Sequence, residues 1–386
     1  MVNTKPYRKK KRPGRNGAPT VRYAHVIGWG VDVPERVLTN QELEGMVDTS
    51  DEWIRERTGI QERRIASERD TPVTMGTRAA RRALAHAGIR PPDLDLIIVA
   101  TSSPVYLFPS TASLIQDKLG AARAGAFDVL AACTGFIYAL GLAAAQIESG
   151  AIETALVIGT ETLSHIVDWS DRNTCILFGD GAGAFVLGAS DQPGGVRHVV
   201  LRSDGSGGDL LYAFSGSRPS WNGSKPPDTL IHMSGREVFR FASRVMVSAT
   251  EEVVERSGLT LDQVDAVVPH QANLRIIEAA ARGLKMPEER FIVNIQRYGN
   301  TSTASIPLAI HEAVQEGRIK PNDRIVLVGF GAGLTWGAAL IEWAVKPTPA
   351  TQLQAIAQES WYILAHVRSL VLRVLRFFEA LLFRRK

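Results

Sequence analysis

From Val21 onward the chain alternates short apolar runs with longer segments in which apolar residues recur every three or four positions. Three runs rich in valine, isoleucine and leucine are predicted to be buried strands: residues 94–101, 154–159 and 324–329. Residues 74–88 and 136–150 have helical periodicity and end at glycine. Strands that alternate with helices predict an α/β fold.

The sequence also contains an internal repeat. Gly88 and Gly258, 170 positions apart, each close a predicted helix that is followed by a short polar link and an apolar run. The glycine-rich segment 179–183 recurs 150 positions later as 329–333. These matches predict two similar halves joined near residues 190–200. The alternative is chance similarity between glycine-rich turns.

The two ends of the chain differ from its body. Residues 1–20 are polar, basic and rich in glycine and proline, so we expect a disordered, solubilising tail. Residues 347–386 are predicted to be a linker followed by a helix. Within 361–386, apolar side chains recur at intervals of three or four and arginines interrupt them, which predicts a basic amphipathic helix. Such a helix either lies on an anionic membrane or packs on protein.

Composition and charge exclude several classes of protein. Hydrophobic residues make up 45% and charged residues 22% of the 386, as in soluble globular proteins. The two ends carry the excess of basic residues, which leaves residues 18–360 with a net charge of −8 and argues against nucleic-acid binding. Cys133 and Cys175 form no C-x-x-C pair, which argues against structural zinc and favours a reducing, cytoplasmic setting.

Cys133 is the first candidate for chemistry. An apolar strand leads through small residues to this cysteine, and a helix rich in alanine and leucine follows. The thiol should therefore lie at a helix N-terminus, where the partial positive charge favours thiolate. The alternative is a buried structural cysteine. Cys175 has apolar neighbours on one side and is expected to be inert.

His270 and Asn300 are the other two candidates. His270 follows a predicted strand, and the ends of strands collect catalytic groups in α/β folds. Asn300 lies beside a glycine, where turn chemistry is the alternative. Together with Cys133 they suit either a papain-like hydrolase or thioester chemistry, in which neutral His and Asn donate to an enolate oxygen. Neither needs a metal or a redox cofactor, and no nucleotide-binding glycine motif is present.

Over residues 22–345 the sequence resembles the β-ketoacyl-acyl-carrier-protein synthase III family of thiolase-like condensing enzymes. The resemblance rests on seven motifs in order: TSDEWI (49–54), RTGI (57–60), FDVLAAC (127–133), FGDGAG (178–183), HQANLR (270–275), GNTS (299–302) and TWG (335–337). It implies a five-layer αβαβα fold built from two similar halves. Residues 21–190 would hold the nucleophile, and residues 191–346 the His and Asn.

The resemblance also implies roles for individual residues and a homodimer. Cys133 would take an acyl group from acyl-coenzyme A, and His270 and Asn300 would support decarboxylation of malonyl-acyl-carrier protein (malonyl-ACP). The remaining site residues that it implies are Ala332 at the oxyanion hole, Phe330 at the decarboxylation site and Phe108 reaching the partner's pocket. Those implied for coenzyme A are Trp53, Arg57, Arg172, Gly235 and Asn273. Those implied for ACP are Arg275, Arg240 and Arg282, for which a solvated basic face is the alternative.

The condensing superfamily contains relatives with different chemistry. A biosynthetic thiolase would need a second catalytic cysteine near residues 329–337, which contain none. An elongating synthase would have histidine in place of Asn300, and a chalcone-synthase-like enzyme usually has proline within the segment at 329–333. A synthase that primes fatty acid synthesis is therefore expected. The alternatives are a related Cys–His–Asn enzyme for longer acyl groups or secondary metabolism, and a non-catalytic binding protein.

Overall fold

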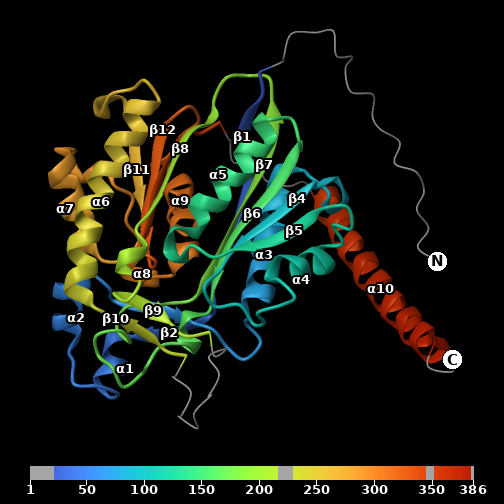
Figure 1. Ribbon diagram of the computed structural model, residues 1–386, viewed down its shortest axis with the longest axis horizontal. Coiled ribbons are helices and arrows are strands. Elements are labelled where there is room, and N and C mark those ends of the chain that lie inside the picture. The colour runs from blue at the N-terminus through green and yellow to red at the C-terminus, as the bar shows by residue number, and fades with distance from the viewer. Residues whose placement is uncertain (1–20, 216–228, 345–351, 384–386) are drawn as a thin grey trace.

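The computed structural model describes residues 21–215, 229–344 and 352–383. Two sheets dominate it (Figure 1). The first has the order β1-β7-β6-β4-β5, with bounds Tyr23–Asp32, Gly181–Ser190, Thr154–Glu161, Leu96–Ala100 and Gly125–Val129. The second has the order β11-β12-β13-β8, with bounds Ala266–Pro269, Arg324–Gly331, Thr335–Glu342 and Gly195–Ser203. The predicted strands are thus confirmed, with ends shifted by a few residues.

Helices cover both sheets and fill the space between them, which gives the predicted five layers (Figure 1). α3 (Pro72–Ala87) and α4 (Thr111–Leu119) pack outside the first sheet. α5 (Gly135–Glu148) and α9 (Ser305–Gln315) lie between the sheets. α6 (Gly235–Arg256) and α7 (Leu274–Leu284) cover the second sheet. The central layer is buried from both sides, which explains why α5 is apolar around most of its circumference.

The smaller elements lie around one end of the two sheets (Figure 1). They comprise β2 (Arg36–Thr39), β3 (Glu62–Ile65), β9 (Leu211–Ala213), β10 (Ile231–Met233), α1 (Asn40–Glu44), α2 (Asp51–Thr58) and α8 (Ile295–Tyr298). β2 pairs with β3, and β9 pairs with β10, both antiparallel. A last helix, α10 (Gln352–Phe383), contacts α3 and α4 along its middle, from Tyr362 to Arg373, and its C-terminal part projects from the body (Figure 1).

Local sequence explains where the helices begin and end. The α3 helix starts at Pro72, two residues before the predicted start, because Thr71 caps it by accepting a hydrogen bond from Thr74 N. It ends at Gly88, whose φ of 65° is the left-handed conformation that glycine adopts without strain. Gly258, which follows α6, has a φ of 70°. The two glycines of the predicted repeat therefore both end a helix in the left-handed conformation.

The sheets confirm the internal repeat but correct part of its alignment. Both sheets contain a parallel pair (β4–β6 or β11–β12) followed by two antiparallel pairs, and the first sheet has β4–β5 as a further parallel pair. Gly159 pairs with Gly183 in the first sheet, and Gly329 pairs with Gly337 in the second. The counterpart of Gly329 is thus Gly159, 170 positions earlier. The predicted match of 179–183 with 329–333 was wrong, because turns next to a ladder favour glycine whatever their place in the fold.

Candidate active site

Cys133 lies where the sequence predicted, in a short 3₁₀ turn (Ala132–Thr134) between β5 and the first residue of α5. The end of β12 packs directly against this turn. A Cβ atom added to Gly331 would lie 2.7 Å from the Cys133 backbone nitrogen, so any side chain at position 331 would displace the nucleophile. Glycine is required there by close approach of two backbones.

The protonation state of Cys133 differs from the expectation. Burial raises the pKa of the thiol to about 12, a hydrogen bond with Ser302 acts in the opposite direction, and the nearby Glu161 raises it further. Desolvation of a thiolate thus outweighs the favourable helix terminus. The helix terminus was expected to favour thiolate, but the raised pKa keeps the thiol protonated at neutral pH, and a base must take its proton before it attacks.

His270 has the geometry of such a base. It follows β11, and its Nδ1 atom lies 2.7 Å from Ser305 Oγ, which itself donates to the Ser302 carbonyl at 2.8 Å. Since a hydroxyl has one proton to give, both contacts are satisfied when His270 Nδ1 carries the proton. Nε2 then keeps its lone pair, and it has no partner in the described part of the chain. Burial lowers the pKa of His270 to about 3, so the ring stays neutral.

The side chain of Asn300 is fixed in the orientation that presents hydrogen-bond donors. Its Oδ1 atom accepts from Ser302 N at 2.9 Å, so its Nδ2 protons are left for a ligand. The backbone of Asn300 is held on both sides, since its N–H donates to Leu177 O and its carbonyl accepts from Gly179 N. This tether to residues 177–179 holds the carboxamide in place.

All three predicted residues line one small cavity. Cys133, His270 and Asn300 face a space of about 90 Å³ whose other walls include Phe330 and Gly331. The Phe330 ring packs edge-on against the His270 imidazole, with centroids 5.4 Å apart. The rest of the lining is largely apolar, with side chains such as Val238 and Ile276. A thiol, an unpartnered imidazole nitrogen and a carboxamide therefore line one largely apolar pocket.

A wider cavity of about 670 Å³ connects this pocket to solvent. Five residues line both cavities: Leu177, Met233, Gly235, Phe239 and Asn273. Of the residues predicted to bind coenzyme A or ACP, six line the wider cavity: Trp53, Arg57, Gly235, Asn273, Arg240 and Arg275. Arg236, which the sequence analysis did not single out, adds another cation to the same rim. We call the wider cavity the route to Cys133. Its opening, the mouth, is lined by cationic side chains, and its inner part is mostly apolar.

Arg172 stacks on the indole of Trp53 at this mouth. Its guanidinium carbon lies 5.0 Å from the ring centroid, and its Nη1 atom donates to the Asp48 carbonyl at 2.9 Å. The guanidinium of Arg57 lies 5.5 Å from the same ring. The predicted adenine sandwich between Trp53 and Arg172 therefore requires these two side chains to separate before a base enters.

Besides Arg172, three predicted residues lie outside both cavities. Arg282 is exposed on α7, two helical turns beyond Arg275. Phe108 is 86% exposed on the segment before α4. Ala332 is half-buried and directly follows Gly331, which lines the inner pocket. Their predicted roles toward ACP, a partner subunit and the oxyanion stay predictions.

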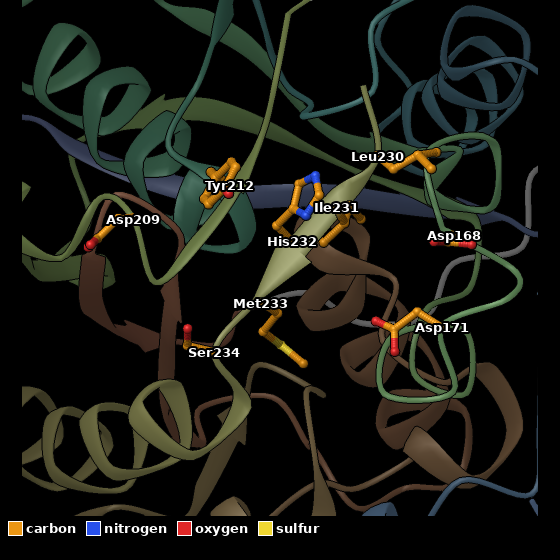
Figure 2. A pocket seen from close by; sticks show the side chains of 9 residues that line it. All are labelled: Asp168, Asp171, Asp209, Tyr212, Leu230, Ile231, His232, Met233 and Ser234. Carbon is orange, nitrogen blue, oxygen red and sulfur yellow. The ribbon is translucent and has the colours of Figure 1, made fainter. Parts of the chain in front are cut away.

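A third cavity, of about 400 Å³, lies beside the route and is polar (Figure 2). Asp168, Asp171 and Asp209 stand around it with His232. Met233 lines this cavity as well as the other two, so its side chain separates it from the way to Cys133. Three carboxylates make this an unsuitable place for a polyphosphate or a carboxylate ligand.

Sequence reasoning missed the polar network behind the nucleophile. Glu161, fully buried at the end of β6, accepts from Ser302 Oγ and Thr303 Oγ1, both at 3.0 Å, and from Ser103 Oγ at 2.7 Å. The backbone N–H of Ser102 donates to the same carboxyl group. Glu161 thereby fixes the segment that follows Asn300. Two features could have revealed it: an acidic residue at the end of an apolar strand, and a run of hydroxyl residues after Asn300.

Comparison with known proteins decides the family. Residues 127–205 match the family model described as 3-oxoacyl-[acyl-carrier-protein (ACP)] synthase III, and residues 254–343 match the model of its C-terminal part. The β-ketoacyl-[acyl-carrier-protein] synthase III of Caldanaerobacter subterraneus subsp. tengcongensis is 49% identical over 324 residues, which are 83% of this chain and 98% of that protein. The chain belongs to the β-ketoacyl-[acyl-carrier-protein] synthase III family. It is therefore a condensing acyltransferase of a family that initiates fatty acid synthesis.

Solved structures agree with the family's thiolase-like fold. The 3-oxoacyl-[acyl-carrier-protein] synthase III of Aquifex aeolicus is 50% identical, with a TM-score of 0.78 over 83% of this chain and all of that one. The priming β-ketosynthase of the R1128 polyketide biosynthetic pathway is 39% identical, with a TM-score of 0.81 over 87% of this chain and all of that one. The structural neighbours of this chain thus include a synthase III and a ketosynthase of a polyketide pathway.

Proposed function

We propose that the enzyme first transfers an acyl group from acyl-coenzyme A to Cys133. His270 Nε2 takes the thiol proton, the sulfur attacks the thioester carbonyl, and the bond from that carbon to the coenzyme A sulfur breaks. The departing sulfur then recovers the proton from His270. Backbone N–H groups of Cys133 and of the stretch at Ala332 would hold the oxyanion. The observation that carries this proposal is that the unpartnered Nε2 atom of His270 and the thiol of Cys133 line the same pocket.

Malonyl-ACP would then enter the emptied route. It loses carbon dioxide, and its enolate oxygen accepts hydrogen bonds from Asn300 Nδ2. The enolate carbon attacks the acyl carbonyl, the carbon–sulfur bond to Cys133 breaks, and the thiolate regains a proton from water. If the hydroxyl of Ser305 turns from Ser302 O to His270 Nδ1, the ring proton can reside on Nε2, and His270 becomes a second donor. No metal or redox cofactor takes part in this scheme.

Mass spectrometry of the intact protein tests the first step. After exposure to a panel of acyl-coenzyme A thioesters, we expect the mass to rise by one acyl group, and peptide mapping should place that group on Cys133. The thioester that reacts fastest identifies the primer, whether acetyl, branched or longer. An acyl group found on another residue, or on none, would contradict the proposal.

A second candidate function is a priming synthase for a secondary metabolite. The similarity to the R1128 priming β-ketosynthase favours keeping it. The same panel separates the two, because a preference for a long or unusual acyl group over acetyl would support this role.

Binding of coenzyme A should depend on the indole of Trp53. Replacing Trp53 with alanine is expected to raise the KM for acyl-coenzyme A by roughly tenfold and to change kcat little, because stacking on a distant ring is lost equally from ground and transition state. Trp53→Phe keeps an aromatic face and is the matched control, with a smaller rise in KM. Steady-state kinetics with varied acyl-coenzyme A measure both. A fall in kcat with an unchanged KM would remove Trp53 from the binding role.

The enzyme is proposed to act as a cytoplasmic homodimer. β5 is an edge strand of the first sheet as described, and large apolar side chains near it are exposed, among them Leu130 at 81% and Phe108 at 86%. An edge strand can pair with another chain, and exposed apolar side chains beside it are typical of a protein interface. Arg240, Arg275 and Arg282 would receive the acidic carrier protein at the mouth of the route. In the described residues no helix has the length and hydropathy to cross a bilayer.

A further inference from the structure

One side of α10 is bound to the body of the enzyme. Tyr362 and Ala365 are only 5% and 7% exposed. The guanidinium of Arg81 on α3 lies 4.1 Å from the centre of the Tyr362 ring. One turn further along, Ser369 Oγ donates to the Asp117 carboxylate of α4 at 2.8 Å, and Arg373 pairs with the same carboxylate. These contacts fix which side of α10 faces outward.

The opposite side of α10 is apolar and exposed. We call it the outer face, and it consists of Ile363, Leu364, Val367, Leu370, Val371, Val374, Leu375, Phe377 and Phe378, each 47–63% exposed. At about 100° per residue these side chains fill a continuous sector of about 160°, and none of them is charged. An exposed apolar surface of this extent on a helix indicates a binding partner.

Basic side chains border this sector on both sides. Arg368 is exposed next to Leu375 at one edge, with the exposed Glu379 beyond it. At the other edge Arg373, which pairs with Asp117, follows Phe377 and His366. Arg376 is also exposed, but it lies on the side of α10 opposite the outer face, beyond the contacts with α4. Arginines at the edges of an apolar sector can extend to lipid phosphates while the apolar side chains enter the acyl region. The arrangement complements an anionic lipid surface.

A second copy of α10 fits the outer face less well. The seam of a two-stranded coiled coil takes two positions in seven, whereas the outer face spans nearly half of the circumference. The cationic borders of two such helices would also repel each other. We propose that α10 lies along the surface of an anionic lipid bilayer with its outer face buried, and that it holds the enzyme there. This adds a location to the enzyme and does not depend on its chemistry.

Vesicle co-sedimentation of the full chain tests this proposal. We expect binding to vesicles of equal parts phosphatidylglycerol and phosphatidylcholine, and binding weaker by about tenfold or more to phosphatidylcholine alone. The triple variant Val367→Glu, Val374→Glu, Phe378→Glu should lose at least about tenfold in affinity. The matched control Val367→Ile, Val374→Ile, Phe378→Leu keeps the face apolar and should bind like the parent. Arg368→Gln, at the edge of the outer face, should weaken the preference for anionic vesicles.

Two further measurements make the result decisive. Condensation with soluble substrates should be unchanged in the triple glutamate variant, which separates a failure of this proposal from a failure of the proposed chemistry. Light scattering on a sizing column reports the mass of the particle. The proposal is overturned if the parent protein ignores both vesicles, if the glutamate variant binds as the parent does, or if that variant changes only the oligomeric mass.

Discussion

Replacing Cys133 with alanine is expected to abolish acyl-enzyme formation and to lower the condensation rate by roughly 10⁴-fold or more, as when other covalent nucleophiles are removed. The reason is specific to the pocket. Burial holds the pKa of the thiol near 12, so chemistry depends on the transfer of one proton to a base beside it. The hydroxyl of a serine at this position is an even weaker acid than the thiol. The Cys133→Ser variant should therefore be as inactive as Cys133→Ala.

Cys175 provides the control for this experiment. It is the other free cysteine, fully buried in a separate apolar cluster, and Cys175→Ala should still acquire one acyl group. Both alanine variants lose one buried or half-buried sulfur atom, so their thermal stability should fall by similar, modest amounts. Intact mass and differential scanning fluorimetry check these outcomes. Normal acylation of the Cys133→Ala protein would rule out the assignment of the nucleophile.

Asn300 should separate the two half-reactions, whereas His270 should affect both. For Asn300→Ala we expect normal acylation of Cys133 and a fall in malonyl decarboxylation of about 100-fold or more, because a preorganised oxyanion donor is lost. Asn300→Asp keeps the shape but replaces the donor with an acceptor and should be as impaired. His270→Ala should slow both half-reactions, since this nitrogen also receives the thiol proton. Single-turnover acylation and release of labelled carbon dioxide measure the two steps.

The pH dependence of acylation provides a further check on His270. Burial keeps the imidazole pKa near 3, below its ordinary value of 6.5. The ring therefore stays neutral from about pH 5 upward, and the acylation rate should show no loss as the pH falls through 6.5. An inflection near that value that disappears in His270→Ala would mean that the ring is solvated and would contradict the buried site.

Much of this site was predictable because its residues occur in contiguous motifs. Cys133 and His270 each follow a strand in the sequence, and an α/β fold brings the ends of such strands together. Asn300 lies in the segment between α8 and α9, and only its motif pointed to it. The network behind them was not predictable. Glu161 lies 141 positions before Ser302, and only the packing of β6 against the segment after Asn300 brings the two into contact.

Two other features depend on tertiary packing. The proton on His270 is placed by Ser305, whose hydroxyl is directed by a carbonyl three residues away. The periodicity of α10 predicted an amphipathic helix, but only the contacts of Tyr362 and Asp117 show which side is bound and which is free. Helical periodicity gives the angular spread of apolar residues, and the contacts with neighbouring helices decide which side of the helix is buried.

The two similar halves contribute different residues to the pocket at equivalent positions of their sheets. The position in the first half that matches His270 is Ala100, 170 residues earlier, and it holds no imidazole. Its carbonyl instead accepts a hydrogen bond from Thr303 Oγ1 at 3.0 Å, three residues after the catalytic carboxamide. The second half thus places an imidazole in the pocket, while the same position in the first half holds the segment that follows Asn300. The pocket therefore depends on residues from both halves, since Cys133 comes from the first half and His270 and Asn300 from the second.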